Sequence, residues 1–488
     1  MHRFAVIVIR HAYFPAILTH KLSQNFGSPQ RAAVTKGPSL MKKATKLGLM
    51  ALVSAVALSV VSVAPAANAG ATCGKRTTVT MLGTIKIEIQ DQFLAAVKDY
   101  NASQSCYTLK SIPGASGQVT FLQQITPMYA AHNAPTITYT LQEIPNMADK
   151  VMDWKGQRLT KLVSKQLLAN GNVGGKQVGV PSTAEAFGLL YNKKVLDAAG
   201  IDPTTIKTRT DLEAAFKTLQ AKGYGAIHFS SIWWSLGAHF SNMYFTTASK
   251  TKEGRLAVLD GLSAGTKDLS ADPAWKNYIA TFDLLKKYNT TKQNLQDTEY
   301  DASIADLASG KTGFLFQGNW TEPNLLQASA TTSFGIMPLP MSTDAKAYGN
   351  DSIPVGVPGY FMVDNIDSTP AERKGAVDFL TWLYTSPAGQ HHVVDPAGKN
   401  GAGGMGFIPV YSGTSVQPAT YMAKVIAGFA SSGKTLDWMN SYYPAGGQDK
   451  YGASGQKFMI DKITAAAYAK EIQDAWKGVS KTWRGEKA

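Results

Sequence analysis

The segment Gly175–Asn192 constrains the fold more than any other stretch of the sequence. Gln177–Pro181 reads as a short strand that stops at proline, which cannot donate to a sheet ladder. Ala186–Tyr191 is an apolar run with the length of a buried strand. Glu185 lies between them, and a charge in such surroundings needs a partner, water or a ligand. We interpret the segment as a passage between two lobes with Glu185 facing the cleft; the alternative is an exposed turn.

The N-terminal region carries the features of an export signal. Met41 begins a basic run, the apolar stretch Leu47–Ala64 follows, and Ala67–Ala69 forms a small-residue cleavage site. Cleavage before Gly70 is therefore expected, which would place the mature protein in the periplasm or on the extracellular face of the membrane. The alternative is a retained membrane anchor, because the apolar stretch is near spanning length. We interpret residues 1–40 as an overextended start or an unusually long n-region.

Charge argues against a nucleic-acid partner. The chain has 488 residues, enough for two or more lobes, with 48 Lys and Arg against 34 Asp and Glu. Eight of the basic residues lie in residues 1–69, which contain no acid. The small excess that remains is spread along the chain, whereas a nucleic-acid-binding protein would be expected to cluster it.

Cys73 and Cys106 are the only cysteines. A pair in an exported chain suggests a disulfide. Each cysteine precedes a strand-like segment, Thr77–Leu82 or Tyr107–Ile112, so parallel pairing of these strands would place both thiols at one end of a sheet. Closing such a loop would contribute roughly 3–4 kcal/mol. The alternatives are two buried free thiols or a lipidated Cys73, which the preceding residues do not favour.

The first part of the mature chain alternates strands and helices. The strands Thr77–Leu82, Tyr107–Ile112 and Pro135–Leu141 are separated by segments with helical apolar spacing. This βαβαβ order predicts a parallel α/β lobe. Ligands of such sheets bind beyond the C-terminal strand ends, which here are Gly83-Thr84, Gly114–Gln118 and Thr140–Glu143.

Two later stretches carry aromatic residues next to strand ends. Trp233 and Trp234 follow the strand Tyr224–Phe229, and Asn319 and Trp320 follow the strand at Thr312–Gln317. An aromatic plate flanked by amides and carboxylates suits the C–H faces and hydroxyl rims of a sugar. The alternative for each tryptophan is packing in the core.

Other motifs point away from nucleotides, metals and cofactors. Gly428–Thr435 matches the phosphate-loop pattern, but the preceding residues read as a helix where that loop requires a strand. No Cys, His and acid cluster has metal-ligand spacing, and no cofactor is expected. No nucleophile-and-base set stands out, although Glu143 and Glu185 could serve a glycosidase.

Several segments together resemble a known family. They are G-K-Q-V-G-V-P…E-A-F-G-L-L-Y-N, F-L-F-Q-G-N-W, G-I-M-P-L-P, F-L-T-W-L-Y-T-S-P-A-G-Q and G-F-I-P-V-Y, and the resemblance spans about Thr77 to Lys477. The chain resembles the extracellular solute-binding proteins of ABC importers, in the sugar-binding family that includes maltose-binding protein. The resemblance implies a two-lobed α/β fold with three inter-lobe crossings. It suggests a first lobe of residues 70–183 with 361–405, and a second of residues 184–355 with 411–488.

The resemblance also implies ligand contacts. Glu185 matches the sugar-binding acid of the crossing, and Trp320 matches a stacking tryptophan. Thr140 stands where maltose-binding protein has a tryptophan, so a specificity for maltodextrins does not follow. The expected ligand-binding residues are Thr84, Ser116, Gln118, Glu143, Glu185, Trp233, Trp234, Asn319, Trp320 and Tyr360.

The function implied is capture of a carbohydrate by hinge closure, with delivery to the membrane subunits of an ABC permease. The protein would then act as a monomer and not as an enzyme. Two alternatives stay open at this point. One is a secreted carbohydrate-active enzyme that uses Glu143 and Glu185, and the other is a ligand-sensing binding protein that does not transport.

Overall fold

The computed structural model describes residues 73–83, 85–86, 89–114, 119–291, 300–396, 403–417, 420–444 and 446–479. All of them belong to one compact unit, Ala67–Ala488. The expected signal segment lies outside the described residues, and so do Thr84, Ser116 and Gln118. Within the described part, no helix is both long enough and apolar enough to cross a bilayer.

The first lobe is built on a five-stranded sheet with the order β2-β1-β3-β12-β6. The first three strands, in chain order, are the ones that the sequence predicts, and β1 pairs in parallel with both β2 and β3. β12 returns antiparallel from much later in the chain and lies between β3 and β6. The bounds are β1 Thr77–Leu82, β2 Tyr107–Ile112, β3 Ile137–Thr140, β6 Val180–Pro181 and β12 Tyr360–Val363.

Two long helices of this lobe pack against each other through aromatic residues. α1 (Gln90–Ser103) buries Phe93 and Tyr100, and the ring centroids of both lie 6.4 and 5.1 Å from that of Phe379 on α13 (Pro370–Thr385). The sequence Thr369-Pro-Ala-Glu372 predicts a capping box at the start of α13, and the structure confirms it. The lobe also contains α2 Phe121–Ala130, α3 Ile144–Met147, α4 Arg158–Lys161, α5 Lys165–Leu168 and α14 Pro387–Val394.

A disulfide joins Cys73 and Cys106, whose Cα atoms are 5.0 Å apart. The two cysteines precede β1 and β2, and these strands are parallel neighbours in register from Thr77 and Tyr107. The backbone N–H of Thr77 donates to the carbonyl of Cys106 at 2.8 Å. The bridge therefore fixes the same end of both strands.

The second lobe is built on a mixed sheet with the order β13-β11-β7-β9-β8, and β10 also pairs with β7. Every residue of β7 is buried, because the strand has neighbours on both sides and lies inside the lobe. The bounds are β7 Glu185–Asn192, β8 Gly225–His228, β9 Thr312–Gly318, β10 Phe334–Met337, β11 Ile353–Gly356 and β13 Thr435–Leu436.

Helices surround this sheet, and one of them begins earlier than the sequence suggests. The sequence Thr210-Asp-Leu-Glu213 by itself predicts a capping box with Thr210 as the cap; this prediction is wrong, because Thr208 caps the helix with Asp211. Thr208 and Asp211 have the same spacing as Thr210 and Glu213. They satisfy the first free N–H groups of a helix that begins two residues earlier. The helices are α6 Lys193–Ala199, α7 Arg209–Ala221, α8 Ser241–Thr247, α9 Lys252–Ser263, α10 Pro273–Tyr288, α11 Tyr300–Ala308, α12 Glu322–Ala328, α15 Tyr421–Ser431, α16 Gly447–Met459 and α17 Ala465–Trp476.

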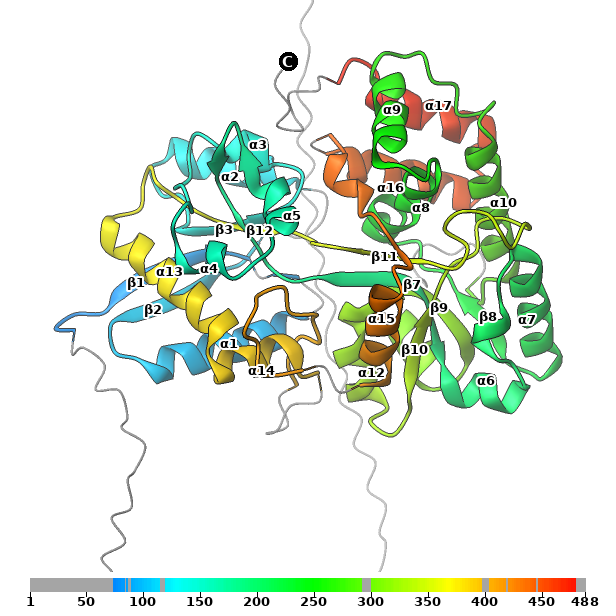
Figure 1. The fold of residues 1–488 in the computed structure, drawn as a ribbon, viewed down its shortest axis with the longest axis horizontal. Helices are drawn as coiled ribbons and strands as arrows, with labels where there is room; N and C mark the ends of the chain where they lie inside the picture. The colour runs from blue at the N-terminus through cyan, green and yellow to red at the C-terminus, as the bar shows by residue number, and fades with distance from the viewer. Residues whose placement is uncertain are drawn as a thin grey trace, which may run out of the picture. The chain divides into compact units, whose positions relative to one another are not determined.

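The chain crosses between the sheets three times, and the crossings are bonded to one another. The first runs from β6 into β7, and the second runs back from β11 into β12 (Figure 1). Between them, the N–H of Ser182 donates to the carbonyl of Gly359 at 3.1 Å. Ala184 and Ile408 exchange two backbone hydrogen bonds of 3.0 and 3.2 Å, which adds the third crossing. The connection is thus a narrow band of three adjacent segments.

Candidate ligand-binding site

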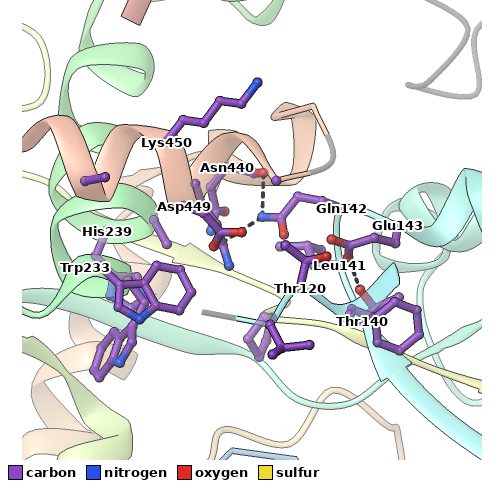
Figure 2. A pocket seen from close by; sticks show the side chains of 18 of the residues that line it. Thr120, Thr140, Leu141, Gln142, Glu143, Trp233, His239, Asn440, Asp449 and Lys450 are labelled. Carbon is purple, nitrogen blue, oxygen red and sulfur yellow. Dashed lines mark hydrogen bonds between the residues drawn. The ribbon is translucent and has the colours of Figure 1, made fainter. Parts of the chain in front are cut away.

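A cavity of about 570 Å³ lies between side chains of the two lobes, close to the crossings. One wall comes from the end of β3 and the start of α2, both in the first lobe. The opposite wall comes from the residues after β8 and from the segment Trp438–Gln456 of the second lobe. Figure 2 shows the two walls facing each other. A volume of this size is typical of a small-molecule site.

The first-lobe wall is polar. The side chain of Gln142 donates to the backbone carbonyl of Asn440 at 3.2 Å and to Oε1 of Gln448 at 3.0 Å, so it links the two lobes (Figure 2). Glu143 is buried and accepts a hydrogen bond from the hydroxyl of Thr140. Burial raises the pKa of the Glu143 carboxyl above its ordinary value.

Asp449 lies on the other wall at the start of α16. Burial raises the pKa of its carboxyl, and its charge in turn raises the pKa of Glu143. The two lobes therefore each present a carboxylate to the same space. Such groups can accept hydrogen bonds from a ligand that brings hydroxyl or ammonium donors.

The second-lobe wall adds aromatic rings to these polar groups. Trp233 and Trp234 precede a π-helical turn, Ser235–Phe240, in which His239 also lines the cavity. The rings of Trp234 and His239 meet edge to face at 5.6 Å. π-Helical turns are frequent at functional sites. This turn packs against α16 so closely that a Cβ at Gly237 would lie 2.0 Å from a backbone oxygen, so only glycine allows the contact.

A buried charge pair closes the inner end of the cavity. Lys86, which follows β1 in the first lobe, lies 2.5 Å from Oε2 of Glu185 at the start of β7. The same ammonium lies 3.7 Å from the ring centroid of Trp320. Glu185 and Trp320 are both fully buried. His239 stacks on Trp320 with a centroid distance of 4.5 Å, and burial, with a smaller contribution from Lys86, holds the pKa of His239 well below its ordinary value.

The residues expected to bind ligand fall into two groups. Glu143, Trp233 and Trp234 line the cavity, whereas the four others that the structure describes do not. Asn319 accepts from the N–H of Ala186 and donates to the carbonyl of Gly406, so it ties two crossings together. Glu185 and Trp320 both contact Lys86, which separates them from the cavity. The hydroxyl of Tyr360 donates to the carbonyl of Leu167.

Several lining residues did not emerge from the sequence. The polar and aromatic interruption between Trp438 and Tyr451 was a signal, but it did not distinguish Trp438, which lines the cavity, from Tyr443, which is buried in the core. No pattern marked Lys86, and Gln142 lay within the predicted strand end Thr140–Glu143 without being named as a ligand-binding residue. The lining residues missed by the sequence interpretation include Lys86, His239, Trp438, Asn440, Gln448 and Asp449.

Among the described residues, no group of three or more His, Cys, Asp or Glu side chains could hold a metal ion. The side chains that line the cavity offer rings, amides and carboxylates. These groups bind and orient a small polar molecule with apolar faces.

The chain belongs to the family of bacterial extracellular solute-binding proteins, whose family model matches residues 95–400. The melibiose/raffinose/stachyose-binding protein MelE of Bacillus subtilis (strain 168) is 26% identical to it over 219 residues. That match covers 43% of this chain and 48% of MelE, so the chain matches about half the length of this curated relative.

The fold is similar to that of solved members of the class. RafE in complex with raffinose has a TM-score of 0.66 and 16% identity, and the match covers 82% of this chain and 98% of that one. A sugar transporter from Bacillus licheniformis in complex with stachyose has a TM-score of 0.62 and 17% identity, again over 82% and 98% of the two chains. At these identities the likeness shows the two-lobed fold.

Proposed function

We propose that the protein binds a carbohydrate in the cavity between its lobes and delivers it to an ABC permease. The observation that carries the proposal is the lining of the cavity, which combines aromatic rings such as Trp233 and Trp234 with amides and carboxylates from both lobes. A sugar ring has apolar C–H faces and a rim of hydroxyls, so it can satisfy both walls at once. The binding protein named for melibiose, raffinose and stachyose supports an oligosaccharide as the ligand.

The aromatic and the polar side chains have separate roles in this proposal. Trp233 and Trp234 supply contact area and bury the faces of the sugar rings. Gln142, Glu143 and Asp449 accept or donate hydrogen bonds at the rim and so select the stereochemistry of the hydroxyls. A site that hydrogen-bonds a hydroxyl discriminates strongly against an analogue without it, because its own buried polar groups would be left unpaired.

The mechanism is closure of the lobes about the crossings. Three adjacent backbone segments connect the sheets, and changes of a few torsions in them can rotate one lobe against the other. A ligand that touches both walls binds the closed arrangement better and therefore shifts the population toward it. The closed lobes would then dock on the permease at the outer face of the membrane.

A thermal-shift screen followed by calorimetry tests the proposal. The purified protein is challenged with melibiose, raffinose, stachyose, maltodextrins and chitin oligosaccharides. A ligand at 100 times its Kd stabilises the protein by about 2.7 kcal/mol. We expect a shift that is lost in Asp449→Asn and kept in Asp474→Asn, which changes an exposed acid on α17.

The sugar must be recovered intact after incubation. Cleaved product would contradict the proposal and favour a carbohydrate-active enzyme. The absence of a shift with every saccharide would also contradict it.

A further inference from the structure

Trp320 is an aromatic plate that the cavity does not reach. Its ring is enclosed by Gly318, His239 and Lys86. A Cβ at Gly318 would lie 2.0 Å from the ring, and the His239 ring stacks on it at 4.5 Å. Lys86 alone among these three belongs to the first lobe, and it also lines the cavity. Its side chain therefore stands between the cavity and the ring of Trp320.

Three ring nitrogens near this point are buried and lack a hydrogen-bond partner within the described part of the chain: Nε1 of Trp320, Nε1 of Trp438 and Nδ1 of His239. The three rings lie against one another, with centroid distances of 4.5 Å for His239–Trp320, 5.7 Å for His239–Trp438 and 6.4 Å for Trp320–Trp438. Buried indole N–H groups usually find a partner. The ring cluster is therefore suited to a molecule that carries hydroxyls.

We propose that Lys86 is a specificity-determining residue that sets the length of the saccharide admitted by the cavity. Its ammonium binds the Glu185 carboxylate and covers the Trp320 ring, so it closes the inner end against a further sugar unit. This inference rests on the proposed function, since it concerns the ligand of the same site. Removal of the Lys86 side chain would open the cavity toward the Trp320 ring, the Glu185 carboxylate and the three ring nitrogens. A longer saccharide can contact these groups.

Lys450 offers a matched control. It lines the same cavity but lies exposed on α16, and Figure 2 shows its side chain directed away from the carboxylates and amides. It contacts neither Glu185 nor Trp320 in the way that Lys86 does. Truncation of Lys450 removes a positive charge from the site and leaves the inner end closed.

The test is calorimetry with saccharide series of increasing length: melibiose, raffinose and stachyose; the maltodextrins from maltose to maltotetraose; and the chitin oligosaccharides of the same lengths. For each variant the ratio of Kd values for the shortest and longest member of a series is measured. We expect Lys86→Ala to shift this ratio toward the longer ligand by at least tenfold and Lys450→Ala to leave it within twofold. The shift should disappear when Trp320→Leu is added to Lys86→Ala.

A second variant controls for destabilisation of the fold by Lys86→Ala. Lys86→Ala leaves Glu185 without its lysine, so Lys86→Ala with Glu185→Gln removes the buried charge as well and should keep the shift toward longer ligands. An unchanged ratio in both Lys86 variants would overturn the inference while the proposed function stands. The same is true of an equal shift in Lys450→Ala. Failure of every saccharide to bind the unmodified protein and all variants would overturn the proposed function, and this inference with it.

Discussion

The two ends of the cavity differ in the partners of their buried carboxylates. At the inner end, Glu185 is paired with Lys86, and the pair lies against an aromatic ring. At the outer end, Glu143 has the hydroxyl of Thr140 as its partner and faces the like charge of Asp449. The comparison shows that one cavity can contain a closed charge pair and an open acidic pair. The first is a structural connection between lobes, and the second is available to a ligand.

The largest effect is expected from breaking the inner pair. Lys86→Ala should lower the free energy of unfolding by about 3 kcal/mol, because it leaves the Glu185 carboxylate buried without its lysine. Denaturant unfolding measures the loss, and Lys450→Ala is the control at the exposed end. Adding Glu185→Gln should restore most of the stability. A Lys86→Ala protein as stable as the unmodified one would show that the pair does not hold the lobes.

The outer end should respond in ligand affinity and less in stability. Trp234 is partly buried and lines the cavity, so Trp234→Ala should weaken saccharide binding by about 2 kcal/mol, or roughly 30-fold. Calorimetry measures the change. Trp382→Ala removes another partly buried tryptophan, on α13 and outside the cavity, and should leave the Kd unchanged. Equal losses in both variants would assign the effect to the fold.

The sequence predicts most of the strands and helices, but only some of the residues that distinguish the two ends of the cavity. Local patterns report on neighbouring residues. The capping box at Thr369 is present, whereas the strand predicted at Gln177–Pro181 is divided into Lys176–Gln177 and Val180–Pro181, of which the second ends at the proline. The position of Thr208 as a cap was missed because Thr210 offered the same pattern two residues later.

The site depended on contacts between distant segments. Lysine is usually solvated, so nothing in the sequence sets Lys86 apart from the other lysines until β1 and β7 are brought together. The same holds for Asp449, which reaches the cavity because α16 packs against the turn containing Gly237. Trp233, Trp234 and Glu143 were found because each follows a strand end, where ligands of α/β sheets bind. Asn319 also follows a strand end, whereas Tyr360 begins β12, and the polar atoms of both are used within the fold.

The pH dependence of stability should distinguish the two ends. Burial raises the pKa of Glu143, so the folded protein keeps a proton that the unfolded chain releases above its ordinary pKa. Stability contributed by this group is therefore present at low pH and is lost as the pH rises through the folded pKa. The glutamine side chain in Glu143→Gln cannot ionise. The variant should therefore be more stable than the unmodified protein at pH 8, by about 1 kcal/mol, and equally stable near pH 4.

Thermal unfolding across this pH range measures the difference. Asp474→Asn is the control, since it removes an exposed acid and should follow the unmodified protein at every pH. Glu185→Gln provides the contrast from the inner end, where loss of the charge removes the ion pair with Lys86 and should lower stability at pH 8. A destabilised Glu143→Gln at pH 8 would mean that the outer carboxylate is held as firmly as the inner one.

The smallest expected effect concerns the neutral link between the walls. Gln142→Ala removes two hydrogen bonds to the second lobe, of 3.2 and 3.0 Å, and each contributes little net free energy because water replaces it in the open state. We expect saccharide affinity to fall by about threefold, mainly through faster dissociation, since the link belongs to the closed arrangement. Stopped-flow fluorescence separates the two rates. Gln456→Ala is the matched control: its side chain lines the same cavity but donates to the carbonyl of Ser231 within the second lobe, so the dissociation rate should not change. If both variants raised the dissociation rate equally, the Gln142 link would have no special part in closure, and the Lys86–Glu185 pair would be left as the contact that holds the lobes together.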